Sequence, residues 1–142
     1  MYKMNKINQE KLEKVLASIS QVKLAYLIGS QKEKRGRKDS DLDLVLVIDQ
    51  QEVKEFDYGQ AYLLIGEAVK HPNLDLRVVT KKIDSPLFLF QVAGGKLLYA
   101  RDEKERVEFE KRAALLYYNT QHLRDIFHYY LNKRLEKGEY GR

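Results

Sequence analysis

Two aspartates stand at alternate positions in an apolar run of this sequence, where charged side chains are least expected. In the segment DLDLVLVI, Asp41 and Asp43 are followed only by leucines, valines and an isoleucine. The segment is short, rich in apolar residues and bounded by polar loops, so it predicts a strand. Because alternate residues of a strand project from one face, both carboxylates lie on the same side, about 6.5–7 Å apart along the strand.

This face of the strand is only partly solvated, because Val45 and Val47 continue it while the alternating leucines point into the core. Burial and like charge raise the pKa of neighbouring carboxyl groups unless a cation compensates. Mg²⁺ is a natural compensator, since it prefers carboxylate oxygens, keeps some of its water and completes its shell with substrate phosphates. The alternative is a pair of solvated aspartates at a strand end, or aspartates paired with nearby lysines.

A glycine–serine pair precedes the aspartates, with ten residues between, and adds a second chemical feature. Gly29 ends the apolar run VKLAYLI and allows another group to approach the backbone closely. Ser30 and Glu33 spell S-x-x-E, a capping box typical of a helix start. The free N–H groups at a helix N-terminus suit a phosphate. Ser30 is therefore either a helix cap alone or a cap that also contacts phosphate.

A third carboxylate, Asp75, stands in the segment LDLRVVT with the same apolar flanks. If this segment pairs beside the strand of the two aspartates, three carboxylates converge on one surface. Arg77 follows two residues later and therefore projects from the same face. It either pairs with Asp75 on an ordinary solvent-facing strand or binds a phosphate.

The elements that must position these residues are indicated by hydrophobic periodicity and by turn residues. The predicted elements are helices at about 5–20 and 58–69, strands at 22–28, 41–48 and 74–80, a short helix or turn from Pro86, and an edge strand at 96–100. Their order indicates one α/β (α+β) domain over residues 1–142, a small mixed sheet with helices on it. Its core covers about residues 1–100.

A helical extension is predicted at about 102–138, because the segment has no proline and no glycine before its last residue. At 1.5 Å per residue such a helix spans roughly 50 Å, more than so small a core can cover. It therefore either breaks near Asn119-Thr120 or projects and packs on a partner. An apolar stripe along it is either core or docking surface, and the tyrosines of this segment, Tyr117, Tyr118, Tyr129 and Tyr130, suit an interface. The stripe consists of Phe109, Ala113, Leu116, Thr120, Leu123, Phe127 and Tyr130.

Composition narrows the function classes. The 142 residues include no cysteine and three scattered histidines, and the formal net charge is +5. Disulfides and thiolate metal sites are therefore excluded, and no apolar run reaches the roughly 20 residues that cross a bilayer. The first residues lack the apolar core of a signal peptide, so we expect a cytoplasmic protein. The positive charge indicates either an anionic partner such as a nucleotide, RNA or an acidic protein, or only a soluble protein rich in lysine. The basic segment 32–38 either contacts such a partner or is a solvated loop.

The segment LIGS, followed by ten residues and DSDLDL, resembles the G-S-x10-D-x-D signature of the polymerase β-like nucleotidyltransferases. It resembles in particular their smallest branch, the minimal nucleotidyltransferases or MntA-type antitoxins found beside HEPN-domain toxins. The leading helix, the glycine–serine turn, the D-x-D strand and LDLRVV fall in the family's order. The resemblance implies the fold of that family, a small mixed β-sheet flanked by helices, here with a long C-terminal helix.

The resemblance also implies roles for the matched residues. Gly29 and Ser30 would hold the β- and γ-phosphates of ATP, and Asp41 and Asp43 would bind two Mg²⁺ ions. Asp75 would be the third carboxylate, which assists the second metal and activates the attacking hydroxyl. Such a site catalyses in-line displacement of pyrophosphate at the α-phosphate.

The implied function is that of an antitoxin that transfers AMP from ATP to a tyrosine hydroxyl of a cognate HEPN RNase toxin, within a hetero-oligomer. Two alternatives stay open. One is nucleotide transfer to RNA, such as tRNA, or to a small molecule, although 142 residues leave little room for an acceptor domain. The other is a non-catalytic antitoxin that works by binding, for which a lost metal ligand is expected, whereas the signature here is complete.

Overall fold

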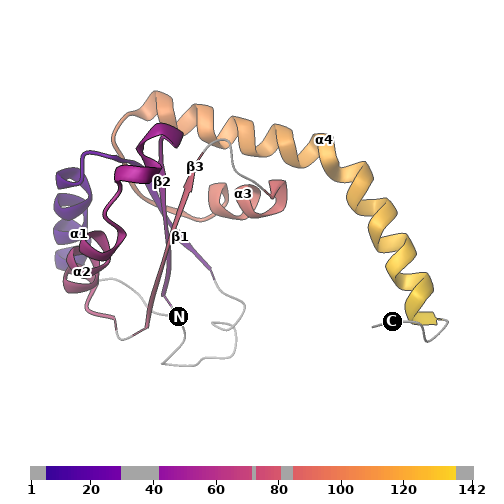
Figure 1. Cartoon of the computed structure of the whole chain (residues 1–142), viewed down its shortest axis with the longest axis horizontal. Helices are drawn as coiled ribbons and strands as arrows, with labels where there is room; N and C mark the ends of the chain where they lie inside the picture. The colour runs from indigo at the N-terminus through magenta and orange to yellow at the C-terminus, as the bar shows by residue number, and fades with distance from the viewer. Residues whose placement is uncertain (1–5, 30–41, 72, 81–84, 137–142) are drawn as a thin grey trace.

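The computed structural model describes residues 6–29, 42–71, 73–80 and 85–136 (Figure 1). Its elements are, in chain order, α1 (Lys6–Ser18), β1 (Val22–Ile28), β2 (Leu42–Ile48), the 3-10 helix η2 (Gln50–Glu55), α2 (Tyr58–Val69), β3 (Leu74–Thr80), α3 (Pro86–Ala93), β4 (Lys96–Ala100) and α4 (Glu103–Glu136). The helices and strands predicted within these ranges are present, with ends within two residues of the predicted ones.

The four strands form one sheet in the order β3-β2-β1-β4. β1 is antiparallel to both of its neighbours, whereas β2 and β3 are parallel. The parallel pair is joined through η2 and α2, because a parallel connection needs a crossover rather than a hairpin. β4 lies at one edge of the sheet, as predicted. The sheet is therefore mixed, and β1 and β2 are its two central strands.

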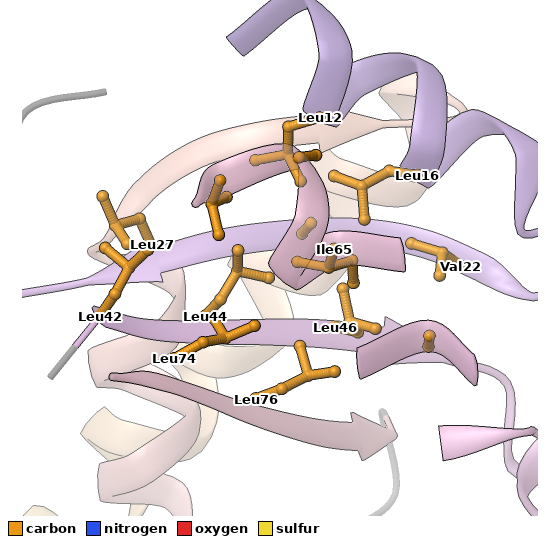
Figure 2. Close-up of a cluster of buried hydrophobic side chains, with 14 residues drawn as sticks. Leu12, Leu16, Val22, Leu27, Leu42, Leu44, Leu46, Ile65, Leu74 and Leu76 are labelled. Atoms are coloured by element: carbon orange, nitrogen blue, oxygen red, sulfur yellow. The ribbon is translucent and has the colours of Figure 1, made fainter. Parts of the chain in front are cut away.

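Apolar side chains cover both faces of the sheet. On one face, Leu42, Leu44 and Leu46 of β2 pack with side chains of α1 and α2 (Figure 2). On the other face, Val45 and Val47 pack with side chains of α3 and of the first part of α4. Figure 1 shows the two helix pairs on opposite sides of the strands. The predicted separation of leucines from valines along this strand is confirmed, and Asp43 belongs to the valine face.

An arginine fastens α1 to the sheet. Arg101 follows β4, and its guanidinium donates hydrogen bonds to the carbonyls of Ala17, Ile19 and Val22 at 2.9–3.1 Å. The last carbonyls of a helix have no partner within the helix, so a cation that binds them stabilises the helix end. Arg101 thereby joins the end of α1, the start of β1 and the end of β4.

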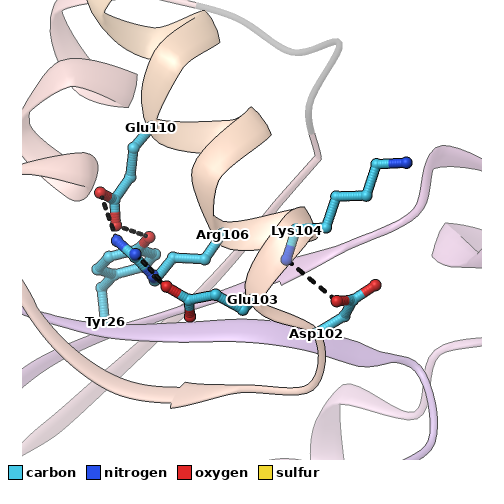
Figure 3. A network of polar contacts seen from close by, with 6 residues as sticks. All are labelled: Tyr26, Asp102, Glu103, Lys104, Arg106 and Glu110. Atoms are coloured by element: carbon cyan, nitrogen blue, oxygen red, sulfur yellow. Dashed lines mark hydrogen bonds and ion pairs between the residues drawn. The ribbon is translucent and has the colours of Figure 1, made fainter.

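A second polar network fastens α4 to the opposite face (Figure 3). The hydroxyl of the buried Tyr26 donates to a carboxylate oxygen of Glu110 at 2.7 Å. Arg106 donates to the other oxygen of Glu110 at 3.0 Å and also bonds to Glu103. Burial, together with the hydrogen bond to Glu110, raises the pKa of Tyr26 far above its ordinary value. The tyrosine therefore stays a neutral donor.

α4 is one continuous helix of 34 residues that bends as it leaves the sheet (Figure 1). Its buried side chains, Phe109 and Ala113, lie in the first half. The hydroxyl of Thr120 donates to the carbonyls of Leu116 and Tyr117, a pattern that often bends helices. The helix is therefore continuous through Asn119-Thr120, where a break was one of the two expectations, and its second half projects (Figure 1). None of the described helices is both long and apolar enough to span a membrane.

Candidate active site

One row of residues crosses three strands at the end of the sheet where β1 stops. The strand pairing sets Ile28 of β1 opposite Asp43 of β2, and sets Asp43 beside Asp75 of β3. Paired residues of neighbouring strands project from the same face, and such strands lie about 4.8 Å apart. Two of the three predicted carboxylates are therefore neighbours on the face that carries α3 and α4.

A pocket of about 520 Å³ opens at this row. Gly29 and Asp43 both line it, so the structure brings the end of β1 and the D-x-D strand to one cavity. Phe88, Phe90 and Gln91 of α3 contribute to its lining. The aromatic lining was not predicted, because phenylalanines in a short helix such as PLFLFQVA are as typical of an ordinary core helix. The volume lies within the range of small-molecule sites, about 300–1,000 Å³.

Asp75 lies beside this pocket and is paired with Arg77. A guanidinium N–H of Arg77 donates to the Asp75 carboxylate across 3.3 Å. The side chain of Arg77 is 55% exposed and that of Asp75 is 39% exposed. The same guanidinium lies over the ring of Phe88, 5.7 Å from the ring centroid. The same-face pairing of Asp75 with Arg77, one of the two alternatives from the sequence, is therefore present. A metal-binding role for Asp75 stays a prediction.

Tyr58, which lies at the outer edge of β3, has a pKa that burial and the negative charge of Asp75 both raise. Burial, followed by the negative charge of Asp75 and the neighbouring Tyr62, raises the pKa of Tyr58. Tyr58 is therefore neutral at pH 7, and its hydroxyl donates to the carbonyl of Leu76. Tyr62 donates to the carbonyl of Leu74 in the same way. These bonds satisfy the carbonyls of β3 on either side of Asp75 and help to hold this strand in register.

The remaining predicted site residues, Ser30 and Asp41, lie outside the described residues, as does the basic segment 32–38. In the part of the chain that the structure describes, no group of three or more acidic or histidine side chains could hold a metal. That part contributes two carboxylates, Asp43 and Asp75, on adjacent strands. Carboxylate oxygens are the donors that Mg²⁺ prefers, so the residues present fit this ion, and Asp41 would complete the set.

The turn between α3 and β4 requires a glycine next to the pocket. A Cβ atom at Gly95 would lie 2.6 Å from the carbonyl oxygen of Leu27 and 3.2 Å from that of Val92. The turn can approach β1 this closely only without a side chain. The sequence indicated Gly94-Gly95 as a helix end, but it gave no sign of this contact, which holds α3 beside the end of β1.

A larger hollow of about 690 Å³ lies between α1 and β4. Its lining includes Glu10, Lys14 and Tyr99, but none of the residues predicted to do chemistry. Size alone therefore does not mark the candidate active site, which is instead marked by the carboxylates and by Gly29.

The chain also matches the model of a known protein family. The family model described as polymerase beta, nucleotidyltransferase matches residues 10–104. This chain belongs to that family. The matched range contains Gly29, Asp43 and Asp75, and it ends at the start of α4. The nucleotidyltransferase family and the mixed α/β fold that the signature implied are thus both confirmed.

Solved structures with a similar fold include several toxin–antitoxin complexes. The structure of a MntA–HepT toxin–antitoxin contains a chain with a TM-score of 0.61 and 21% identity, covering 87% of this chain and 95% of that chain. A chain of a toxin–antitoxin structure with AMP-PNP has a TM-score of 0.61 and 21% identity, covering 84% of this chain and 94% of that chain. The structure of a tri-AMPylated Shewanella oneidensis HEPN toxin in complex with an MNT antitoxin contains a chain with a TM-score of 0.60 and 20% identity, covering 86% of this chain and 93% of that chain. This likeness establishes the nucleotidyltransferase fold. No curated protein matches the chain.

Proposed function

We propose that this nucleotidyltransferase is a cytoplasmic antitoxin that transfers AMP from ATP to a tyrosine hydroxyl of a cognate HEPN-domain RNase toxin and so neutralises it. The observation that carries the proposal is the pairing of Asp43 with Asp75 at a pocket that Gly29 lines. Two structural neighbours support the choice of substrates, since one contains AMP-PNP and another contains an AMPylated HEPN toxin.

In the proposed reaction, the acceptor hydroxyl oxygen bonds to the α-phosphorus of ATP, and the bond from that phosphorus to the β-phosphate oxygen breaks. Asp75 receives the hydroxyl proton, and pyrophosphate leaves. Gly29 and Ser30 would hold the β- and γ-phosphates, and Asp41 and Asp43 would hold two Mg²⁺ ions with the help of Asp75. When bound, a pair of such ions stabilises charge on the attacking and leaving oxygens of an in-line displacement.

The projecting half of α4 supplies a surface for the toxin. Leu123, Phe127 and Tyr130 are 62–64% exposed and recur at spacings of four and three, so they lie on one face of the helix. Transfer to a protein acceptor requires that acceptor to dock, and the neighbours named above are complexes with toxins. We therefore assign this face to the HEPN-domain partner, in a hetero-oligomer.

The proposal is tested by following label from ATP. The purified protein is incubated with Mg²⁺ and the protein encoded by the neighbouring gene, with ATP labelled at either the α- or the γ-phosphate. We expect label on the partner from α-labelled ATP alone, with release of pyrophosphate. Asp43→Asn should lower the transfer rate at least about a hundredfold, because losing a direct ligand exceeds the 10–100-fold effect of residues that only orient one.

The control is Asp57→Asn, which changes a carboxylate at the N-terminus of α2, where its side chain accepts a hydrogen bond from the Gln60 N–H. Asparagine caps a helix as well as aspartate does, so this variant should keep its transfer rate. Label that goes to tRNA and not to the protein would support the RNA alternative. Full neutralisation of the toxin by Asp43→Asn would show that the antitoxin works by binding alone.

A further inference from the structure

Arg77 lines the pocket of the candidate active site, whereas Asp75, with which it pairs, lies beside that pocket. The arginine lines the pocket together with Gly29 and Asp43, and Asp75 is not part of that lining. Its guanidinium is supported from one side by the ring of Phe88, which also lines the pocket. The side chain therefore presents a cation to the cavity in which the nucleotide is proposed to bind.

The hydrogen bond between Arg77 and Asp75 is long for a bond between two charged groups. The two atoms are 3.3 Å apart, whereas charge-assisted N–H···O bonds are typically about 2.7–2.9 Å long. Both side chains are partly exposed, and exposed ion pairs contribute little to stability. Little free energy is therefore needed to separate this pair and redirect the guanidinium.

In the proposed reaction, a divalent cation and Arg77 compete for the negative charge of Asp75. A carboxylate that helps to bind a divalent cation and accepts a proton is a poorer partner for a guanidinium, because each of these positive charges weakens its attraction for another cation. A triphosphate offers the guanidinium a better partner, since its oxygens match the planar donor fork and carry more negative charge.

We propose that Arg77 is a phosphate-binding residue that exchanges partners. It pairs with Asp75 as in this structure, and it moves to the β- or γ-phosphate when a nucleoside triphosphate binds, which releases Asp75 for the reaction. In the position paired with Asp75, the guanidinium lies over the ring of Phe88, which also lines the pocket, so a short movement of the side chain suffices for the exchange. This inference rests on the proposed function, because it takes a nucleoside triphosphate as the ligand.

The test compares binding of two nucleotides that differ in phosphate number. Binding of α,β-methylene-ATP, which cannot release pyrophosphate, and of AMP is measured by calorimetry with Mg²⁺ present. We expect Arg77→Met to weaken binding of the triphosphate analogue about tenfold to a hundredfold, the range of one or two charge-assisted hydrogen bonds. AMP affinity should change less than about twofold. Arg77→Lys should fall between, because lysine keeps the charge but loses the fork.

The matched control is Arg134→Met, the same substitution on the projecting half of α4, where the side chain is exposed. It should leave both affinities unchanged. Equal effects of Arg77→Met on the two nucleotides, or no effect, would overturn the inference while leaving the proposed function standing. A wild-type protein that binds no triphosphate analogue would overturn both.

A second measurement detects the exchange itself without metal or activity. In EDTA, Asp75→Asn should strengthen binding of the triphosphate analogue, because Arg77 no longer has to leave a carboxylate. This gain in affinity should disappear when Asp75→Asn is made in an Arg77→Met background. The two single variants and the double variant form a double-mutant cycle, which isolates the coupling between the two residues. A gain that persists in the double variant would mean that Asp75 merely repels phosphate, and the exchange would be refuted.

Discussion

At the scale of single residues, the site depends on which strands happen to be neighbours. Asp43 and Asp75 could each be recognised as unusual, because each interrupts an apolar strand. That they lie side by side could not be predicted from the residues alone, because nothing local in LDLRVVT states which strand it joins. The parallel pairing of β2 with β3 decides it. The family resemblance supplied this adjacency indirectly, by assigning both residues to one site.

Gly95 offers a test of the close approach that holds α3 against β1. Gly95→Ala places a methyl group 2.6 Å from the Leu27 carbonyl oxygen, so the backbone must shift. We expect a loss of about 1–3 kcal/mol in the free energy of unfolding, as for other overpacking substitutions. Because the turn also lines the pocket, affinity for the triphosphate analogue should fall too. Chemical denaturation and calorimetry measure the two effects.

The matched control for this substitution is Gly66→Ala in the interior of α2. There the added Cβ atom would meet the nearest atom of Leu74 at 3.8 Å, an ordinary contact distance. Alanine favours the helix over glycine, so this variant should gain roughly 0.5–1 kcal/mol. If both glycine substitutions shift stability in the same direction, the proposed role of the Gly95 contact is wrong.

At the scale of elements, two polar networks attach helices to the sheet, and hydrophobic patterning does not reveal them. Helix positions followed from spacing, as in α1, and strand positions followed from apolar runs. The partners of Arg101 and Tyr26 could not be predicted, because these residues bond to segments that are distant in the sequence. A charged residue just after a strand is ordinarily solvated, and a tyrosine inside a strand is ordinarily core.

Arg101 should matter for stability far more than its position after an edge strand suggests. Arg101→Ala leaves the carbonyls of Ala17, Ile19 and Val22 without this donor, at the junction of α1 and β1. We expect a loss of about 2–4 kcal/mol in the free energy of unfolding, given the usual worth of hydrogen bonds to charged groups. Lys111→Ala, an exposed change on α4, should shift it by less than about 0.5 kcal/mol. Urea titration checks both values, and equal effects would contradict the capping role.

The bond from Tyr26 to Glu110 should give the protein a specific sensitivity to alkaline pH. The folded pKa of Tyr26 is raised, so the stabilisation is fully present below the ordinary tyrosine pKa near 10 and is lost as pH rises through the folded value. Wild type should exceed Tyr26→Phe in stability by about 1–3 kcal/mol at pH 8. The difference should shrink steadily above pH 10.

Thermal melts of both proteins from pH 7 to 11 measure this difference, and subtraction removes the titration of the other tyrosines. Glu103 behaves oppositely, because its hydrogen bond with Arg106 lowers its pKa. Its contribution is present above the ordinary glutamate pKa and is lost as pH falls through the folded value. A stability difference between wild type and Tyr26→Phe that grows above pH 10 would contradict the assigned bond.

At the scale of the whole molecule, α4 joins the catalytic domain to the surface assigned to the toxin. The heptad-like stripe predicted along it proves to be divided. Phe109 and Ala113 are core, whereas Leu123 and Phe127 are exposed beyond the bend. Tyr117, predicted among the docking tyrosines, instead stacks on Phe90 with ring centroids 4.1 Å apart. Periodicity could not reveal this division, because an apolar stripe has the same sequence spacing whether the sheet or a partner protein covers it.

The exposed half of α4 should be needed for the complex but not for nucleotide binding. Leu123→Glu and Phe127→Glu place a charge on the face assigned to the HEPN-domain partner, where it would be buried unpaired. We expect affinity for that partner to fall at least about a hundredfold, as for substitutions at interface hot spots. Affinity for the triphosphate analogue should not change. Size-exclusion chromatography and calorimetry distinguish the two properties.

Asn132→Glu is the matched control, because this exposed residue lies on the opposite side of the helix from Leu123. It should bind the partner like wild type. Equal loss in all three variants would point to a general effect of added negative charge, and intact binding in all three would move the docking surface elsewhere on the molecule.

The alternation of side chains along β2 has a consequence for how the enzyme can fail. A slip of one residue in the pairing of this strand would turn Asp43 toward α1 and α2 and expose Leu42 and Leu44 to the pocket. Such a chain would bury an uncompensated carboxylate, so it would not survive as a stable misfolded form. Correct pairing of β2 and correct placement of Asp43 are therefore a single event in this domain. A preparation should contain inactive unfolded molecules and active folded ones, and the count of nucleotide-binding sites should equal the count of folded chains.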